Sequence, residues 1–209
     1  MEVSMDELLA AASVIPVLAV KNAADAEPLA HALARGGLRV VEMTLRTDAA
    51  IEVMQRMQAA EPELIVGMGT LRTGDDVTRS VAAGAHFLVS PGLTDELAAA
   101  MLAVDVPALP GVATASEAMT ASAAGFEAMK FFPAEQAGGL DYLKSLKGPL
   151  PDIRFCPTGS ITRERAADYL ATPNVACVGG SWIANAAMIE AGQWDEIEAN
   201  ARFATSLKG

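Results

Sequence analysis

The sequence contains only two cysteines, Cys156 and Cys177, and neither has the C-x-x-C spacing of a metal or redox site. Both lie in apolar runs, which indicates small buried thiols. No group of His, Asp or Glu residues has the spacing of metal ligands either. Although 52% of the residues are hydrophobic, no run approaches the roughly eighteen apolar residues that a membrane-spanning helix requires. A disulfide framework, a metal centre and a membrane span are therefore not expected.

Positive charge is also scarce, since 15 Lys and Arg residues face 26 Asp and Glu residues, for a net charge of -11. Such a balance argues against nucleic acid or an anionic membrane as a partner. A small anionic ligand is still compatible, because backbone N–H groups can hold a phosphate. Residues 1–9 are acidic and lack the basic and apolar regions of a secretory signal, so we expect a cytoplasmic protein.

What the chain has in abundance is a regular alternation of two kinds of segment. Short apolar, β-branched runs are typical of buried strands. They occupy residues 14–20, 38–45, 64–68, 86–89, 106–109, 128–132, 153–156 and 175–178. Between them lie alanine-rich stretches whose larger apolar residues recur at helical spacing. Repeated strand–helix units predict a parallel sheet covered by helices.

About eight such units in one domain-sized chain favour a closed (β/α)8 (TIM) barrel, formed by a single domain spanning 1–209. Residues 4–12 are expected to form an extra N-terminal helix and residues 185–207 a long final helix. Polar residues that precede the helical stretches predict N-caps at Thr47–Asp48, Thr73, Thr94, Thr114 and Thr162. Glycines that follow these stretches predict helix ends at Gly36–Gly37, Gly84 and Gly125.

Lys130 lies inside one of the apolar runs, and lysine is seldom buried unless it is paired. Alternation along a strand places its side chain on the same face as Ala128 and Phe132. Three interpretations are open. The lysine extends its ammonium group to water, forms an ion pair, or serves as a nucleophile, since burial disfavours the charged form of an amine.

In a (β/α)8 barrel the functional residues lie at the carboxyl ends of the strands and in the loops that follow. The second strand carries Glu42, Thr44 and Arg46 on one face, and we expect this polar face to point inward. A structural Glu–Arg pair is one interpretation. A carboxylate and a lysine inside the same barrel favour an active site.

Glycine-containing segments end three other strands. Gly67-Met68-Gly69-Thr70 permits close backbone approach, or simply forms a tight turn. Gly159-Ser160 and Gly180-Ser181 follow the seventh and eighth strands, where many such barrels bind phosphate. This position favours a phosphorylated or carboxylated ligand.

Six motifs occur in an order that resembles the bacterial 2-keto-3-deoxy-6-phosphogluconate (KDPG) aldolases, which also act on 4-hydroxy-2-oxoglutarate. They are VVEMTLRT at 40–47, GMGT at 67–70, SPGLT at 90–94, MKFFPAE at 129–135, RFCPTG at 154–159 and GGSW at 179–182. The resemblance spans residues 14–182.

The resemblance implies a metal-free, cofactor-free class I aldolase of the Entner–Doudoroff pathway on a homotrimeric (β/α)8 barrel. It places the Schiff-base lysine at Lys130 and the acid–base glutamate at Glu42. Substrate contacts map onto Arg46, Thr70, Pro91, Lys130, Phe132 and Thr158, and phosphate contacts map onto Gly159, Ser160, Gly180 and Ser181.

Two residues depart from the family pattern. Ser160 stands where the family usually has glycine, and Met68 stands where it usually has alanine. The Cβ of Ser160 is expected to crowd its loop if φ is positive there. Two alternatives stay open: a related pyruvate aldolase for the galactonate-derived or the unphosphorylated sugar acid, and a non-catalytic phosphosugar-binding barrel.

Overall fold

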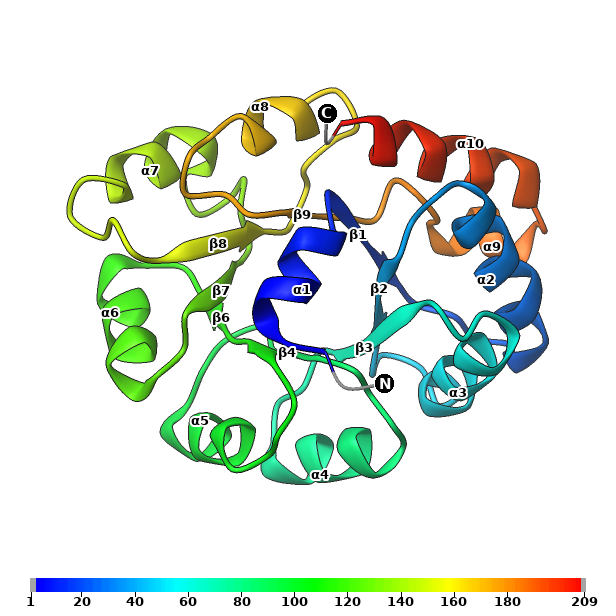
Figure 1. The fold of residues 1–209 in the computed structure, drawn as a ribbon, viewed down its shortest axis with the longest axis horizontal. Helices are drawn as coiled ribbons and strands as arrows, with labels where there is room; N and C mark the ends of the chain where they lie inside the picture. Colours follow the sequence, from blue (N-terminus) through cyan, green and yellow to red (C-terminus); the bar gives the residue numbers. More distant parts are fainter. Residues whose placement is uncertain (1–2, 208–209) are drawn as a thin grey trace.

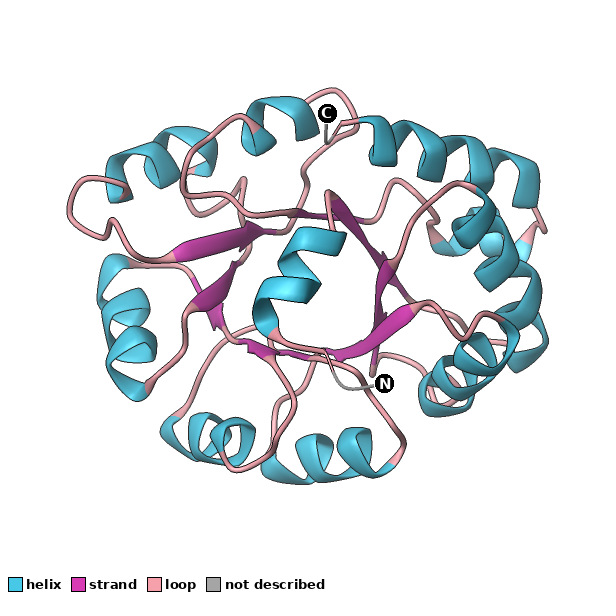
Figure 2. Ribbon diagram, viewed as in Figure 1, coloured by secondary structure: helices cyan, strands magenta, loops and turns pink. Residues whose placement is uncertain are grey.

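The computed structural model describes residues 3–207, so residues 1, 2, 208 and 209 of the expected domain lie outside the described range. Strands and helices alternate along the chain, and the strands form a curled parallel sheet with helices on its outer side (Figures 1 and 2). Six strands are joined in the order β5-β4-β3-β2-β1-β9, and three more in the order β6-β7-β8. Among the described residues, no helix is long and apolar enough to cross a membrane.

The strands are short and buried. They are β1 (Val14–Leu18), β2 (Val40–Thr44), β3 (Ile65–Gly69), β4 (Leu88–Val89), β5 (Ala108–Leu109), β6 (Gly111–Val112), β7 (Ala128–Phe131), β8 (Arg154–Pro157) and β9 (Val178–Gly180). Isolated bridges join Phe155 to Val175 and Thr158 to Gly179, so the end of β8 lies beside β9. The carboxyl ends of β8 and β9 are therefore neighbours.

The helices follow the strands in turn. They are α2 (Ala26–Arg35), α3 (Ala50–Ala60), α4 (Gly74–Ala82), α5 (Asp95–Leu102), α6 (Ala115–Ala124), α7 (Gly139–Leu146), α8 (Ala166–Leu170), α9 (Ala186–Glu190) and α10 (Trp194–Ser206), with a 3-10 turn η1 (Ala23–Asp25) before α2. Thr73, Thr94 and Thr114 cap α4, α5 and α6 through their side chains, as the sequence predicts.

Alternation along the strands divides the buried side chains into two clusters. The larger cluster lies between the sheet and the helices and includes Val41, Met43 and Met68. The smaller one, which we call the interior cluster, collects the opposite faces of the strands. Its members are Leu8, Leu9, Ala12, Ile15, Val40, Ile65, Phe87, Val89, Leu109, Ala128, Cys156 and Cys177.

Helix α1 (Met5–Ala11) closes one end of this interior. Figure 1 shows it lying across the opening of the curled sheet. Leu8 and Leu9 of α1 belong to the interior cluster, and Asp6 accepts a hydrogen bond from Arg154 at the start of β8, at 2.6 Å. Because the chain enters each strand at this end, α1 covers the amino ends of the strands and leaves the carboxyl ends free.

Three local expectations are wrong. The expected helix 185–207 is two helices, because Gly192 between them adopts a left-handed φ of +64°. Thr47 does not cap α3, which begins after Ala49, and its hydroxyl donates to the Val20 carbonyl oxygen. Thr162 does not cap α8, which begins after Arg165.

Candidate active site

Lys130 on β7 and Glu42 on β2 meet inside the curled sheet. The Lys130 Nζ lies 3.1 Å from Glu42 Oε1 and 3.4 Å from Oε2. The two residues are only 6% and 4% exposed. Of the three interpretations of Lys130, exposure of its ammonium group to water is therefore wrong. The carboxylate can accept the ammonium proton and leave a neutral amine, which is a nucleophile.

Gly69 makes room for the Glu42 side chain. A Cβ built on Gly69 would collide with the Glu42 carboxylate, and one on Gly67 would collide with the Phe87 ring. These glycines therefore face the interior, while Met68 between them is buried on the helix side. The departure at Met68 consequently lies outside the site.

Arg46 lies just beyond β2 and is exposed. Its Nε donates to Thr44 Oγ1 at 3.0 Å, and Thr44 in turn donates to the Leu18 carbonyl oxygen at 2.7 Å. Because the partner of Glu42 is Lys130, the interpretation as a structural Glu42–Arg46 pair is wrong. The sequence predicts that Thr44 lies on the inward face, but it assigns Thr44 no role. The position of Thr44 two residues before Arg46, on the same face of the strand, is the sequence feature that indicates a contact between them.

Thr70 follows β3 with a φ of +64°. A β-branched residue in this left-handed region is strained, and such strain concentrates at functional sites. Thr70 is half-buried, at the carboxyl end of the strand that neighbours β2. The role of Thr70 in substrate contact stays a prediction.

Three further expected site residues lie around β7, the strand that carries Lys130: Phe132, Pro91 and Thr158. The Phe132 ring centroid lies 5.3 Å from Lys130 Nζ, within the range of a cation–π contact. Pro91 lies against β6, because a Cβ on Gly111, the pairing partner of Lys130, would collide with the Pro91 carbonyl group. Thr158 is buried, and its hydroxyl occupies the space that a Cβ on Gly179 would need.

The two expected phosphate segments lie side by side after β8 and β9, as the bridge between Thr158 and Gly179 requires. Gly159 and Ser160 adopt φ values of +117° and +57°. Ser160 is thus a non-glycine residue in the left-handed region, so the positive φ under which its Cβ is expected to crowd the loop is present. Its Oγ accepts a hydrogen bond from Gln136 Nε2 at 2.9 Å, while Gly180 is buried and Ser181 is exposed.

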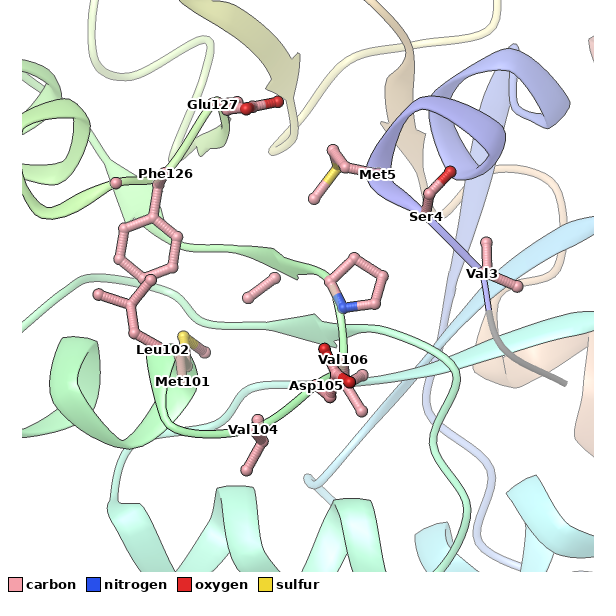
Figure 3. A pocket seen from close by; sticks show the side chains of 13 residues that line it. Val3, Ser4, Met5, Met101, Leu102, Val104, Asp105, Val106, Phe126 and Glu127 are labelled. Atoms are coloured by element: carbon pink, nitrogen blue, oxygen red, sulfur yellow. The ribbon is translucent and has the colours of Figure 1, made fainter.

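A cavity of about 390 Å³ opens at the opposite end of the molecule. Figure 3 shows its lining side chains, among them Met5, Val106 and Phe126. Met5 begins α1, and Val106 and Phe126 precede β5 and β7, so the cavity adjoins α1 and the amino ends of the strands. We assign the candidate site to the carboxyl ends, because the buried titratable pair is there and this cavity does not include it.

The remaining reactive side chains have structural partners. His31 forms a hydrogen bond with Glu61, with 2.6 Å between His31 Nδ1 and Glu61 Oε1. The Val66 N–H donates to His86 Nδ1, so both histidines have partners that the sequence did not identify. Cys156 and Cys177 are buried and form no disulfide. Within residues 3–207, no three His, Cys, Asp or Glu side chains gather as metal ligands.

Comparison with known proteins identifies the family to which this chain belongs. The family model described as KDPG and KHG aldolase matches residues 5–200. The 2-dehydro-3-deoxy-phosphogluconate aldolase of Pseudomonas aeruginosa is 45% identical over 96% of this chain and 91% of its own. The KHG/KDPG aldolase of Escherichia coli K12 is 42% identical over 96% of this chain and 94% of its own.

A solved structure agrees with these relatives. The KDPG aldolase of Legionella pneumophila, which holds pyruvate as a covalent carbinolamine intermediate, is 43% identical with a TM-score of 0.91. The superposed region covers 94% of this chain and 95% of the Legionella chain. The chain therefore belongs to the KDPG and KHG aldolase family.

Proposed function

We propose that this protein is a class I aldolase that cleaves KDPG to pyruvate and glyceraldehyde 3-phosphate. By the same chemistry it cleaves 4-hydroxy-2-oxoglutarate to pyruvate and glyoxylate. The observation that carries the proposal is the buried contact between Lys130 Nζ and Glu42 Oε1, at 3.1 Å, inside a member of this family. A nucleophile within hydrogen-bond reach of a base is the arrangement that covalent catalysis needs.

The first half of the reaction uses Lys130. After its proton passes to Glu42 or water, the neutral amine attacks the C2 carbonyl carbon of the 2-keto acid and forms a carbinolamine. The carbinolamine hydroxyl group takes that proton back and leaves as water, which restores the Glu42 carboxylate and gives an iminium ion that withdraws electrons from the neighbouring bonds. Arg46 and Thr70 hold the adjacent carboxylate through charge-assisted hydrogen bonds. Pro91, Phe132 and Thr158 line the space around the amine.

The second half uses Glu42 as the base. Its carboxylate, directly or through a water, removes the proton of the C4 hydroxyl group. The C3–C4 bond then breaks, the aldehyde leaves, and the bonding electrons form an enamine on Lys130. Protonation at C3 and hydrolysis of the resulting iminium release pyruvate and restore the amine. Gly159, Ser160, Gly180 and Ser181 hold the distal phosphate through N–H and hydroxyl groups.

We also propose that the chain forms one domain in which the two sheets complete a closed eight-stranded barrel. The Thr158–Gly179 bridge beside β9 and the continuity of β5 and β6 through Pro110 support closure on both sides. The family resemblance supports a homotrimer, which light scattering on the purified protein tests.

A substrate panel tests the reaction itself. We expect purified protein to release pyruvate from KDPG and from 4-hydroxy-2-oxoglutarate, and to keep full activity in excess EDTA because the amine activates the substrate without a metal. Coupled assay of pyruvate measures both results. Preference for the C4 epimer or for the unphosphorylated sugar acid would favour the related aldolases. Binding of phosphosugar without pyruvate release would indicate a non-catalytic protein, and inhibition by EDTA would contradict the lysine mechanism.

Gly69→Ala tests the placement of Glu42. The new Cβ would take the space of the carboxylate, and a displacement of about 1 Å can cost about 10²-fold in rate. We expect kcat to fall by about that factor while borohydride still traps pyruvate on Lys130. Gly148→Ala is the control, since no atom lies within 4 Å of a Cβ there. Equal kcat values in the two variants would mean that Glu42 does not need this position.

A further inference from the structure

Glu135 lies in the loop that follows the lysine strand β7 and has two side-chain partners from another part of the chain. Tyr169 Oη donates to Glu135 Oε1 at 2.8 Å, and Arg165 Nη1 donates to Oε2 at 2.7 Å. Tyr169 belongs to α8 and is completely buried, and Arg165 immediately precedes that helix. The carboxylate of Glu135 therefore ties the loop after β7 to the helix that follows β8.

The backbone of the same loop is joined to the segment after β8. The Ala134 N–H donates to the Thr158 carbonyl oxygen at 2.8 Å, and the Glu135 N–H donates to that of Gly159 at 3.3 Å. Gly159 also lies close to this loop, because a Cβ there would be 3.1 Å from the Ala134 nitrogen. Movement of Glu135 would therefore be passed directly to Thr158 and Gly159.

The start of helix α7 also lies against this cluster. Gly139 adopts a φ of +62°, and a Cβ on it would lie 3.4 Å from Tyr169 Oη and 3.5 Å from Glu135 Oε2. Burial raises the pKa of Tyr169, and the hydrogen bond to Glu135 raises it further. The phenol consequently keeps its proton at neutral pH and remains a donor. Arg165 offsets the charge of Glu135, which would otherwise repel an anion at Gly159 and Ser160.

We propose that Glu135, Tyr169 and Arg165 are positioning residues that hold the segment 158–160 at a fixed distance from Lys130. The inference rests on the proposed aldolase function, because it assigns the cluster to recognition of the phosphate end of the substrate. None of the three needs to touch the reacting atoms. Loss of the cluster lets the segment 158–160 shift relative to β7, so a substrate anchored at both ends is affected more than one anchored at the keto acid alone.

Tyr169→Phe is the direct test, since it removes the phenol hydrogen bond and keeps the ring. We expect kcat/KM for KDPG to fall by about tenfold or more, while kcat/KM for the same sugar acid without phosphate changes by less than about twofold. Borohydride trapping of pyruvate on Lys130 is expected to continue at the wild-type rate. The melting temperature is measured alongside.

Tyr142→Phe is the matched control. It also removes one phenol hydrogen bond, which Tyr142 Oη accepts from the Ala115 N–H at 3.1 Å, but it leaves the cluster intact. We expect its ratio of activities on the two substrates to equal that of the wild type. If Tyr169→Phe does not fold, Glu135→Gln is used instead, with the same expected change in ratio.

Equal losses on the two substrates, or no loss on either, would overturn the positioning role and leave a purely structural one. The proposed function is tested separately, by the activity of the wild-type protein. If the wild type releases no pyruvate from either substrate, the aldolase assignment fails, whereas an active wild type with an unchanged ratio in the variants rejects only the positioning role.

Discussion

Replacement of Lys130 with methionine is expected to abolish the covalent adduct that borohydride traps in the presence of pyruvate. Methionine fills similar space but has no amine to attack the C2 carbonyl carbon. Because every later step needs the iminium ion, we expect kcat to fall by about 10⁴-fold or more, as when other covalent nucleophiles are removed. Mass spectrometry of the digested protein measures the adduct, and pyruvate release measures kcat.

The stability of this variant needs a parallel measurement. Removing Lys130 leaves the buried Glu42 carboxylate without its cation, and breaking a buried ion pair costs about 3–5 kcal/mol. A domain with a free energy of unfolding of about 5–15 kcal/mol can remain folded after such a loss, though near the lower limit. Circular dichroism at the assay temperature therefore accompanies the activity measurement.

Lys144→Met is the matched control, because Lys144 is an exposed residue of α7. It is expected to keep the wild-type adduct and rate. An adduct that persists in Lys130→Met, or that maps to another lysine, would reject Lys130 as the Schiff-base residue.

Replacement of Glu42 with glutamine has the second largest expected effect. The amide oxygen can still accept a hydrogen bond from Lys130, but the side chain can no longer take the C4 hydroxyl proton. General acid–base catalysis contributes about 10²–10⁴-fold, so we expect kcat to fall by that factor. Single-turnover rates of cleavage, compared with the rate of pyruvate trapping, separate the proton-transfer step from Schiff-base formation.

The two rates distinguish the roles of the pair. Continued trapping with slow cleavage is the expected pattern for a base that acts after the iminium forms. An unchanged kcat would remove Glu42 from the mechanism, and loss of trapping as well would mean that Glu42 is needed to deprotonate Lys130. Glu63→Gln is the control, because Glu63 is an exposed carboxylate beyond α3 that pairs with Arg39.

The sequence predicted most of what depends on local rules. The alternation of side chains along β2 predicts that Glu42 points inward. The same alternation along β7 places Lys130 on the same face as Ala128, which belongs to the interior cluster. Thr73 and Thr94 cap their helices because a hydroxyl three residues before a free N–H needs no tertiary partner. Thr47 is not a cap because α3 begins after Ala49, and the Thr47 hydroxyl donates to the Val20 carbonyl oxygen of a distant segment.

What the sequence could not supply depends on contacts between distant segments. The signs of φ at Thr70 and Ser160 follow from the loops around them, not from the residue types, which disfavour such values. The partners of Glu135 lie 30 and 34 positions away in the chain, so its presence in a family motif gave no indication of Tyr169 or Arg165. The break at Gly192 was a missed feature with a usable local signal, a glycine within a helical stretch.

Helix α1 has a consequence for the order in which products leave. Its leucines belong to the same buried cluster as Ile15 and Val40, so α1 closes the amino ends of the strands and access to Lys130 is left to the carboxyl ends. In the proposed reaction pyruvate stays bonded to the Lys130 amine after the C3–C4 bond breaks, whereas the aldehyde is then free. The aldehyde accordingly departs first through the carboxyl ends of the strands, and in the reverse direction pyruvate enters before its acceptor.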